Sequence, residues 1–182
     1  MGSPKPLLKV GGITFIQNIL SSYATAGISQ HIVLGKHSTE ITSTIDLSSG
    51  KVLVNPDPSR GPLSSLLIAL EQASTSDAFI LHPVDHPLVS RKTIQSLVSG
   101  FERVPHCILI PEFRGRRGHP VLIPSKYYPE LRQAPLSEGA RWVVRANRAS
   151  NHLVSVNDPG ILLNIDTGED YRQLTGYPRL YR

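Results

Sequence analysis

Short apolar runs alternate with amphipathic stretches through the first hundred residues of the chain. In three stretches, apolar residues fall at positions i, i+3, i+4 and i+7, the spacing of a helix with one buried face. These stretches are residues 16–23, 63–70 and 94–101. Three short apolar runs predict buried strands between and beside the helices. These runs are residues 31–35, 51–54 and 78–81.

The second half of the chain continues this pattern, and glycine, proline and serine residues mark where several of the predicted helices begin or end. Gly27 is expected to end the first helix, Pro62 suits the first turn of the second, and Ser90 is placed to cap the third. A helix is predicted around residues 142–144, and a closing helix from Thr167 onward. Further strands are predicted at residues 107–111, 120–123, 152–156 and 161–165. The alternation predicts one α/β domain over residues 1–182, with a mostly parallel sheet covered on both faces.

Composition narrows the class of protein without identifying it. The 182 residues are enough for one domain with a real core, and 40% are hydrophobic. A net charge of +5 suits an anionic partner, but the absence of a long basic run and the low aromatic content disfavour nucleic acid. The single cysteine, Cys107, excludes a disulfide within the chain and a cysteine-rich metal site. No segment is predicted to be a signal peptide or a membrane helix, so the expected location is the cytoplasm.

The sharpest chemical signal is Asp85, which follows the predicted strand at residues 78–81 within the segment Pro-Val-Asp-His-Pro-Leu. Ligands of open α/β sheets bind at the carboxyl ends of strands. A carboxylate at that place is suited to hold a divalent metal and, through the metal, a phosphate. The alternative is an ordinary Asp-x-Pro turn. Five other histidines are scattered without metal-ligand spacing: His31, His37, His82, His106 and His152.

The beginning of the chain departs from the usual order of such folds. The first strand of these sheets normally lies centrally and carries a glycine-rich phosphate loop. Here residues 5–8 lead into the first predicted helix, and no strand precedes them.

Four motifs occur in the order in which one family has them. They are Gly-Ser-Pro-Lys-Pro-Leu-Leu (2–8), Val-Asp-His-Pro-Leu-Val (84–89), Gly-Arg-Arg-Gly-His-Pro-Val-Leu (115–122) and Asn-Ile-Asp-Thr-Gly-Glu-Asp-Tyr (164–171). Together they resemble the MobA-like NTP transferase family, and most closely its molybdenum cofactor cytidylyltransferases. The resemblance spans nearly the whole chain. It implies a Rossmann-like three-layer α/β/α nucleotidyltransferase fold.

The resemblance also implies a reaction and its metal. CMP would pass from CTP to the phosphate of a molybdopterin-type cofactor, with release of pyrophosphate. Mg²⁺ would be held by Asp85, Asn164 and Asp166, where many relatives have Asp in place of Asn164. Residues 164 and 166 are expected on one face of a strand. Lys5 would neutralise the triphosphate, so Lys5 and Asp85 are the expected catalytic residues.

Two further groups of residues follow from the same resemblance. The nucleotide would be bound by Gly2, Lys5, Gly61, Ser64 and Ser65. The acceptor would be bound by Arg117, Gly118, His119 and Pro120. The alternatives are helix capping for the first group, and a turn histidine with surface charge for the second. His86 is given no role.

The chain lacks the strand and the Leu-Ala-Ala-Gly-x-Ser-x-Arg-Met-Gly segment with which relatives begin. Either the chain starts late or it is a natural short form. We expect it to bind nucleotide poorly and to be unstable or dependent on a partner, because the edges of neighbouring strands would be exposed.

Other functions remain open at this point. GTP could replace CTP, and the acceptor could be another phosphorylated or sugar-like molecule. A non-catalytic protein that binds and delivers the molybdenum cofactor belongs to a different class. The expected partners are therefore small molecules and possibly a recipient molybdoenzyme, with no nucleic acid and no membrane.

Overall fold

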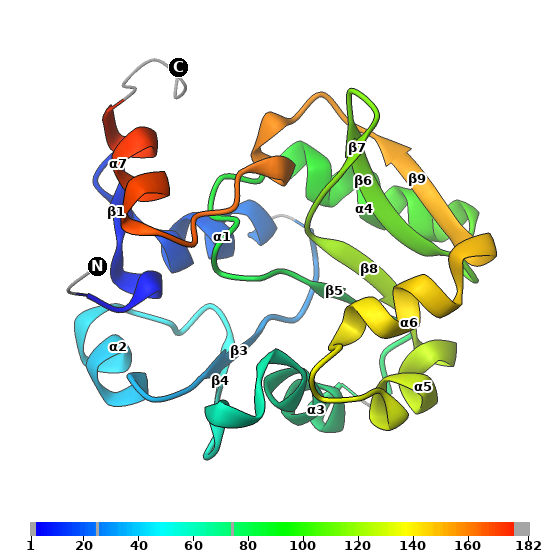
Figure 1. Cartoon of the computed structure of the whole chain (residues 1–182), viewed down its shortest axis with the longest axis horizontal. Coiled ribbons are helices and arrows are strands. Elements are labelled where there is room, and N and C mark those ends of the chain that lie inside the picture. The colour runs from blue at the N-terminus through cyan, green and yellow to red at the C-terminus, as the bar shows by residue number, and fades with distance from the viewer. Residues whose placement is uncertain (1–2, 25, 74, 177–182) are drawn as a thin grey trace.

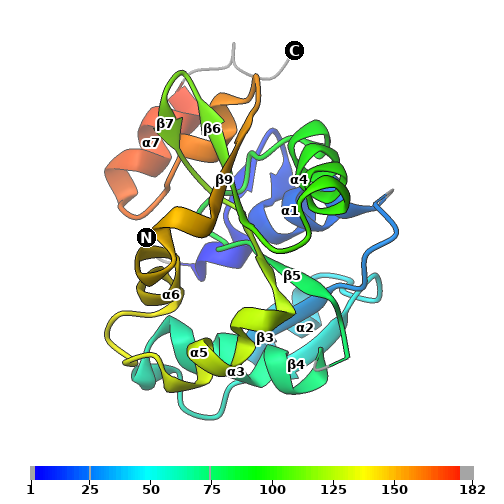
Figure 2. The same ribbon diagram turned by 90° about the vertical axis from the view of Figure 1, so that its right-hand side faces the viewer.

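Helices lie on both faces of a mixed sheet in the computed structural model, which describes residues 3–24, 26–73 and 75–176 (Figures 1 and 2). The helices are α1 (Phe15–Tyr23), α2 (Ser38–Thr44), α3 (Pro62–Gln72), α4 (Arg91–Arg103), α5 (Tyr128–Gln133), α6 (Ala140–Ala146) and α7 (Gly168–Gly176). The strands are β1 (Lys9–Val10), β2 (Ile13–Thr14), β3 (His31–Leu34), β4 (Lys51–Val54), β5 (Ala78–Leu81), β6 (Ile108–Phe113), β7 (Arg116–Arg117), β8 (Val121–Pro124) and β9 (Asn151–Ser155). Short 3-10 turns include Lys5–Leu7 and Pro159–Leu162. The predicted α/β class is confirmed.

The larger sheet has five strands, with β8 between β5 and β6, and with β7 and β9 also paired to β6. Because β8 is antiparallel to both β5 and β6, those two strands run in the same direction, and β9 runs parallel to β6. Strands β3 and β4 form a separate parallel pair. Within the described ranges, no strand joins this pair to β5.

Local signals in the sequence explain where the long helices begin. The Thr14 side chain accepts a hydrogen bond from the Gln17 backbone N–H in a capping box, and α1 starts directly after it. Pro62 occupies the first turn of α3, and the Ser90 hydroxyl caps α4, as predicted. The first helix ends at Tyr23, earlier than the expected end near Gly27.

The predicted strand at residues 161–165 is wrong. Pro159–Leu162 form a 3-10 turn, and residues 163–166 have no regular structure. The buried carboxylate of Asp158 explains the turn, since it accepts hydrogen bonds from the Gly160 N–H at 2.9 Å, from the N–H of the α4 cap Ser90 and from the Thr93 hydroxyl of α4. These bonds satisfy backbone groups locally and compete with strand pairing.

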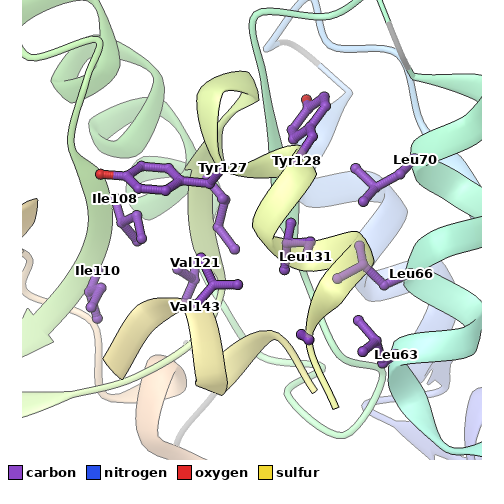
Figure 3. Close-up of a cluster of buried hydrophobic side chains, with 12 residues drawn as sticks. Leu63, Leu66, Leu70, Ile108, Ile110, Val121, Tyr127, Tyr128, Leu131 and Val143 are labelled. Carbon is purple, nitrogen blue, oxygen red and sulfur yellow. The ribbon is translucent and has the colours of Figure 1, made fainter. Parts of the chain in front are cut away.

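The main core lies between the larger sheet and the helices α3, α5 and α6 (Figure 3). The leucines of the predicted α3 face, Leu63, Leu66 and Leu70, are buried there against Leu131 of α5. Its remaining members come from β6, β8, α6, α5 and the residues that flank α5. On the opposite face, Ile94 and Leu97 of α4 are fully buried. Side chains packed on both faces hold the sheet in place. The C-terminal end of β5 and the N-terminal end of β8 carry the loops described next.

No helix in the described ranges is long and apolar enough to cross a membrane.

Candidate active site

The loop after β5 carries Asp85 next to the C-terminal segment that precedes α7. The Asp85 carbonyl oxygen accepts a hydrogen bond from the Ile165 N–H at 2.8 Å, and the His86 N–H closes a turn on the Pro83 carbonyl at 3.2 Å. Residues about eighty positions apart in the sequence are therefore joined through their backbones. This contact brings the predicted metal residues Asp85, Asn164 and Asp166 to one end of the sheet.

Lys5 lies at the same place, bound to Asp166. Its ammonium Nζ is 2.6 Å from Asp166 Oδ1, and Asn164 Nδ2 donates to Asp166 Oδ2 at 2.6 Å. The expected shared strand face of residues 164 and 166 is wrong, because these residues are not in a strand; a side-chain hydrogen bond joins them instead. The Lys5 hydrogen bond is the largest cause that holds the pKa of Asp166 below its ordinary value.

Replacing Lys5 by methionine is expected to raise the pKa of the Asp166 carboxyl toward its ordinary value, because the ammonium donor is lost. A carbon-13 NMR titration of the Asp166 carboxyl measures the shift. The matched control is Lys9→Met, which removes an exposed lysine four positions away. Titration curves of Asp166 that coincide in the wild type and Lys5→Met would contradict this assignment.

His86 and His119 pack against each other beside Asp85. Their ring centroids are 4.8 Å apart at an interplanar angle of 48°. Burial is the main cause that lowers the pKa of both rings; the carboxylate of Asp85 partly offsets this for both, and Asp166 also does so for His86. Asp85 Oδ1, His86 Nδ1 and His119 Nδ1 are all buried without a hydrogen-bond partner within the described part of the chain. Buried polar atoms without partners are uncommon and costly in native proteins, so this group is suited to a polar ligand.

Gly118 places His119 at this position by close backbone approach. A Cβ at residue 118 would lie 2.2 Å from the Ile161 carbonyl oxygen, the same oxygen that accepts a hydrogen bond from the His119 N–H at 3.0 Å. Only glycine lets the two segments come this close. The Gly-His-Pro motif is therefore held directly against the 3-10 turn that leads to Asn164.

A cavity of about 540 Å³ opens next to His119. Its apolar lining includes Leu81, Ile110 and Val121 of the sheet, and Pro62 marks its border at the start of α3. Its polar lining comprises Arg117, Gly118, His119, Ser137, Glu138, Gly139 and Arg141. Glu138 Oε2 lies 3.5 Å from both the Arg141 and Arg145 side chains. The cavity thus combines a flat apolar wall with arginine side chains, a composition suited to an amphipathic anion.

The serine side chains at the start of α3 form hydrogen bonds with other residues of the chain. Ser64 Oγ donates to the Gly61 carbonyl at 2.7 Å and accepts from Asn55 Nδ2 at 2.8 Å. Ser65 Oγ accepts from the same Asn55 amide at 2.9 Å. Asn55, which follows β4, is a buried residue that sequence reasoning did not single out. Gly2, the remaining residue of the expected nucleotide group, lies outside the described residues.

A second network, also missed from the sequence, supports the Asp85 loop. The Tyr23 hydroxyl of α1 lies 2.9 Å from His82 Nδ1, and His82 Nε2 lies 2.9 Å from the His86 carbonyl oxygen. Burial lowers the pKa of His82 to about 4 and raises that of Tyr23. The apolar spacing predicted Tyr23 only as a core residue, and His82 had no metal-ligand neighbour in the sequence.

A larger cavity of about 630 Å³ lies elsewhere, around the C-terminal half of α1 and the loops that precede β3 and β4. It contains none of the predicted site residues.

The end of β5 in this α/β fold carries a loop with a carboxylate, with a lysine and a cavity near it, an arrangement expected of a nucleotide-binding enzyme. Residues 1–153 match the MobA-like NTP transferase domain, and the chain belongs to this family. The match includes Lys5, Asp85 and His119, whereas Asn164 and Asp166 follow it.

Known proteins similar to this chain agree with the fold. Nicotine blue oxidoreductase of Paenarthrobacter nicotinovorans is 26% identical over 180 residues, which are 94% of this chain and 87% of that protein. The homologue of Mycobacterium tuberculosis Rv0371c from Mycobacterium sp. strain JC1 superposes with a TM-score of 0.84 at 24% identity, over 97% of this chain and 88% of that one. Rv0371c itself, from M. tuberculosis H37Rv in complex with manganese, gives 0.77 at 23% identity, over 95% and 91%.

Proposed function

We propose that the protein transfers CMP from CTP to a phosphate of a molybdopterin-type cofactor and releases pyrophosphate. The observation that carries the proposal is the buried Oδ1 of Asp85 after β5, which has no hydrogen-bond partner within the described residues. The Lys5–Asp166 ion pair lies at the same end of the sheet, and the cavity beside His119 adjoins it through the contact of His119 with His86. Membership of the family supports nucleotidyl transfer in general. The choice of CTP and of the acceptor rests on the motif around Gly118 and His119.

The oxygen atoms around Asp85 are suited to a hard divalent cation such as Mg²⁺ or Mn²⁺. Asp85 Oδ1 is unpartnered within the described residues, the Asn164 amide offers a carbonyl oxygen, and the Asp166 carboxylate keeps further lone pairs beside its two hydrogen bonds. The described residues contain no group of three or more His, Cys, Asp or Glu side chains placed to hold a metal. We therefore expect the triphosphate itself to complete the coordination, as is usual for Mg²⁺. The cation would neutralise the phosphate charge that builds up during transfer.

The chain's own residues would position the two substrates. Lys5 would neutralise the triphosphate, and Arg117 and Arg141, which line the cavity, would hold an anionic group of the acceptor. The acceptor phosphate would attack the α-phosphorus in line as the bond to pyrophosphate breaks. A phosphate group is already largely ionised at neutral pH, so its attack needs no general base. His86 and His119 are accordingly proposed to donate or accept hydrogen bonds in the site, with His119 and Pro120 facing the acceptor.

The start of α3 is the proposed nucleotide side. The Ser64 hydroxyl is already bonded to Gly61 and Asn55, so its role there would be to shape the turn. Gly61, at φ 86° in the left-handed region, supports the tight turn that brings the helix N-terminus toward the cavity. The free backbone N–H groups of a helix N-terminus favour an anion.

Calorimetric titration of CTP and GTP, each with Mn²⁺, into the full chain tests the proposal. We expect CTP to bind weakly and only with the metal, and Asp85→Ala to weaken that binding at least about tenfold further, which corresponds to about 1.4 kcal/mol. Glu102→Ala removes an exposed carboxylate of α4 and is the matched control, with unchanged binding.

Two results would contradict the proposal. Tighter binding of GTP than of CTP would assign the protein to guanylyl transfer. A folded chain that binds neither nucleotide would favour the non-catalytic alternative, in which the cavity holds and delivers the cofactor.

A further inference from the structure

His82 connects the helix α1 to the loop that carries Asp85. It is the first residue after β5, and its ring packs against Tyr23 with centroids 5.7 Å apart. One ring nitrogen lies 2.9 Å from the Tyr23 hydroxyl and the other lies 2.9 Å from the His86 carbonyl oxygen. Both nitrogens of this buried imidazole are therefore used.

The chemistry of the partners fixes the direction of both hydrogen bonds. A carbonyl oxygen can only accept, so His82 Nε2 carries the proton and donates to His86. Nδ1 of the neutral ring is then a bare acceptor, and the Tyr23 hydroxyl donates to it. Burial at this position favours the same protonation states, because it keeps the proton on the tyrosine hydroxyl and keeps the histidine neutral.

This chain of hydrogen bonds ends beside the candidate metal residue. The His86 carbonyl belongs to the peptide that follows Asp85 by one residue, and the Asp85 carbonyl is held separately by the Ile165 N–H at 2.8 Å. Two successive carbonyls are thus fixed by donors from distant parts of the sequence. The Asp85–His86 peptide is also held through its N–H, which donates to the Pro83 carbonyl at 3.2 Å, so the backbone on the C-terminal side of Asp85 is fixed over two successive peptides.

We propose that His82 and Tyr23 are positioning residues, which hold the His86 carbonyl so that the Asp85 carboxylate is presented to the site with Oδ1 free for a ligand. The inference rests on the proposed function only for the identity of that ligand, a divalent cation bound with nucleotide. Without the His82 donor, the loop gains freedom, and Asp85 loses its fixed orientation. Preorganisation of this kind is what second-sphere hydrogen bonds provide around metal ligands.

Three variants of the full chain separate positioning from general stability. His82→Leu removes both hydrogen bonds, His82→Gln keeps an N–H that can donate to the carbonyl, and Tyr23→Phe removes only the orienting hydroxyl. Hydrogen exchange measured by mass spectrometry follows the loop at residues 84–88 and, as an internal reference, strand β6 at 108–113. Electron paramagnetic resonance of Mn²⁺ with CTP measures the affinity of the metal site.

In His82→Leu we expect exchange in residues 84–88 to rise at least about tenfold, with β6 unchanged, and Mn²⁺ affinity to fall at least about tenfold. In His82→Gln both values should return most of the way to wild type, and Tyr23→Phe should fall between. Unchanged exchange in 84–88, an equal rise in β6, or unaltered Mn²⁺ affinity in His82→Leu would each overturn the positioning role. If wild type itself binds no Mn²⁺ with CTP while the loop responds as expected, the proposed function fails but the hydrogen-bonded support of Asp85 stands.

Discussion

Replacing Gly118 by alanine is expected to lower the free energy of unfolding by about 3 kcal/mol and to move His119 away from His86. The added Cβ would lie 2.2 Å from the Ile161 carbonyl oxygen and 2.7 Å from its carbonyl carbon. Both atoms belong to backbone, so neither can turn aside as a flexible side chain would. The His119 N–H bond to that oxygen would break as the segments separate. Denaturant unfolding measures the loss of stability, and NMR of the His119 ring measures the displacement.

Gly115→Asn is the matched control for this experiment. Gly115 lies in the same hairpin at φ 76°, and a Cβ there would meet nothing within 4 Å. Asparagine tolerates the left-handed region better than most residues, so the expected loss is well under about 1 kcal/mol. Equal losses in the two variants would contradict the assignment of the Gly118→Ala loss to the contact with Ile161, because Gly115 has no such contact.

Acidification from pH 6.5 to pH 4 is expected to destabilise the protein by about 3 kcal/mol through His82 alone. The pKa of this histidine falls to about 4 in the fold, because its ring is buried. In the unfolded chain the same ring takes up its proton near pH 6.5. Between these values the unfolded state binds more protons than the folded state, so stability decreases as the pH falls, at about 1.4 kcal/mol per pH unit. The lowered pKa values of His86 and His119 act in the same direction.

Urea unfolding at a series of pH values between 4 and 7.5 measures this effect. His82→Gln removes the titrating ring. Between pH 4 and 6.5 the free energy of unfolding of this variant should therefore change less with pH than that of the wild type, by about 1.4 kcal/mol per pH unit, the effect of one proton. The comparison at pH 7.5 gives the cost of the substitution itself and serves as the reference. Parallel pH profiles for the variant and the wild type would exclude His82 as a cause of acid sensitivity.

The spacing of apolar residues predicted the long elements well, because each of them buries one face. Helices α1, α3 and α4 and strands β3, β4 and β5 all lie where the pattern placed them. Helix α2 was not predicted, since its sequence Ser-Thr-Glu-Ile-Thr-Ser-Thr buries only Ile41 and carries no apolar stripe. The prediction of a strand at residues 161–165 was wrong for a different reason, since here an apolar run is present but does not form a strand. Ile161 and Ile165 are buried there, but the hydrogen bonds of Asp158 hold the start of this segment in a turn.

The candidate site could be predicted only in part. The order of motifs pointed to Asp85, Lys5 and Asp166, and the structure brings these three residues together. Whether they act as expected remains a prediction. The contact of Tyr23 with His82 joins residues 59 positions apart, and no local pattern marks such a pairing. Partners of this kind depend on how α1 packs over the end of β5, which is a property of the tertiary structure.

The break between the two sheets has a consequence for how the protein loses its structure. Strands β3 and β4 pair with each other and share a small core of their own, formed with Ile16, Ile41 and Leu47. The single tryptophan, Trp142, packs instead against the core of the five-stranded sheet. Side-chain contacts join the two parts, among them the bonds from Asn55 after β4 to Ser64 and Ser65 of α3. Units that share no strand pairing can differ in the free energy at which they open. Tryptophan fluorescence would therefore follow the half of the molecule that holds the candidate site, and opening of the β3–β4 pair alone would change it little.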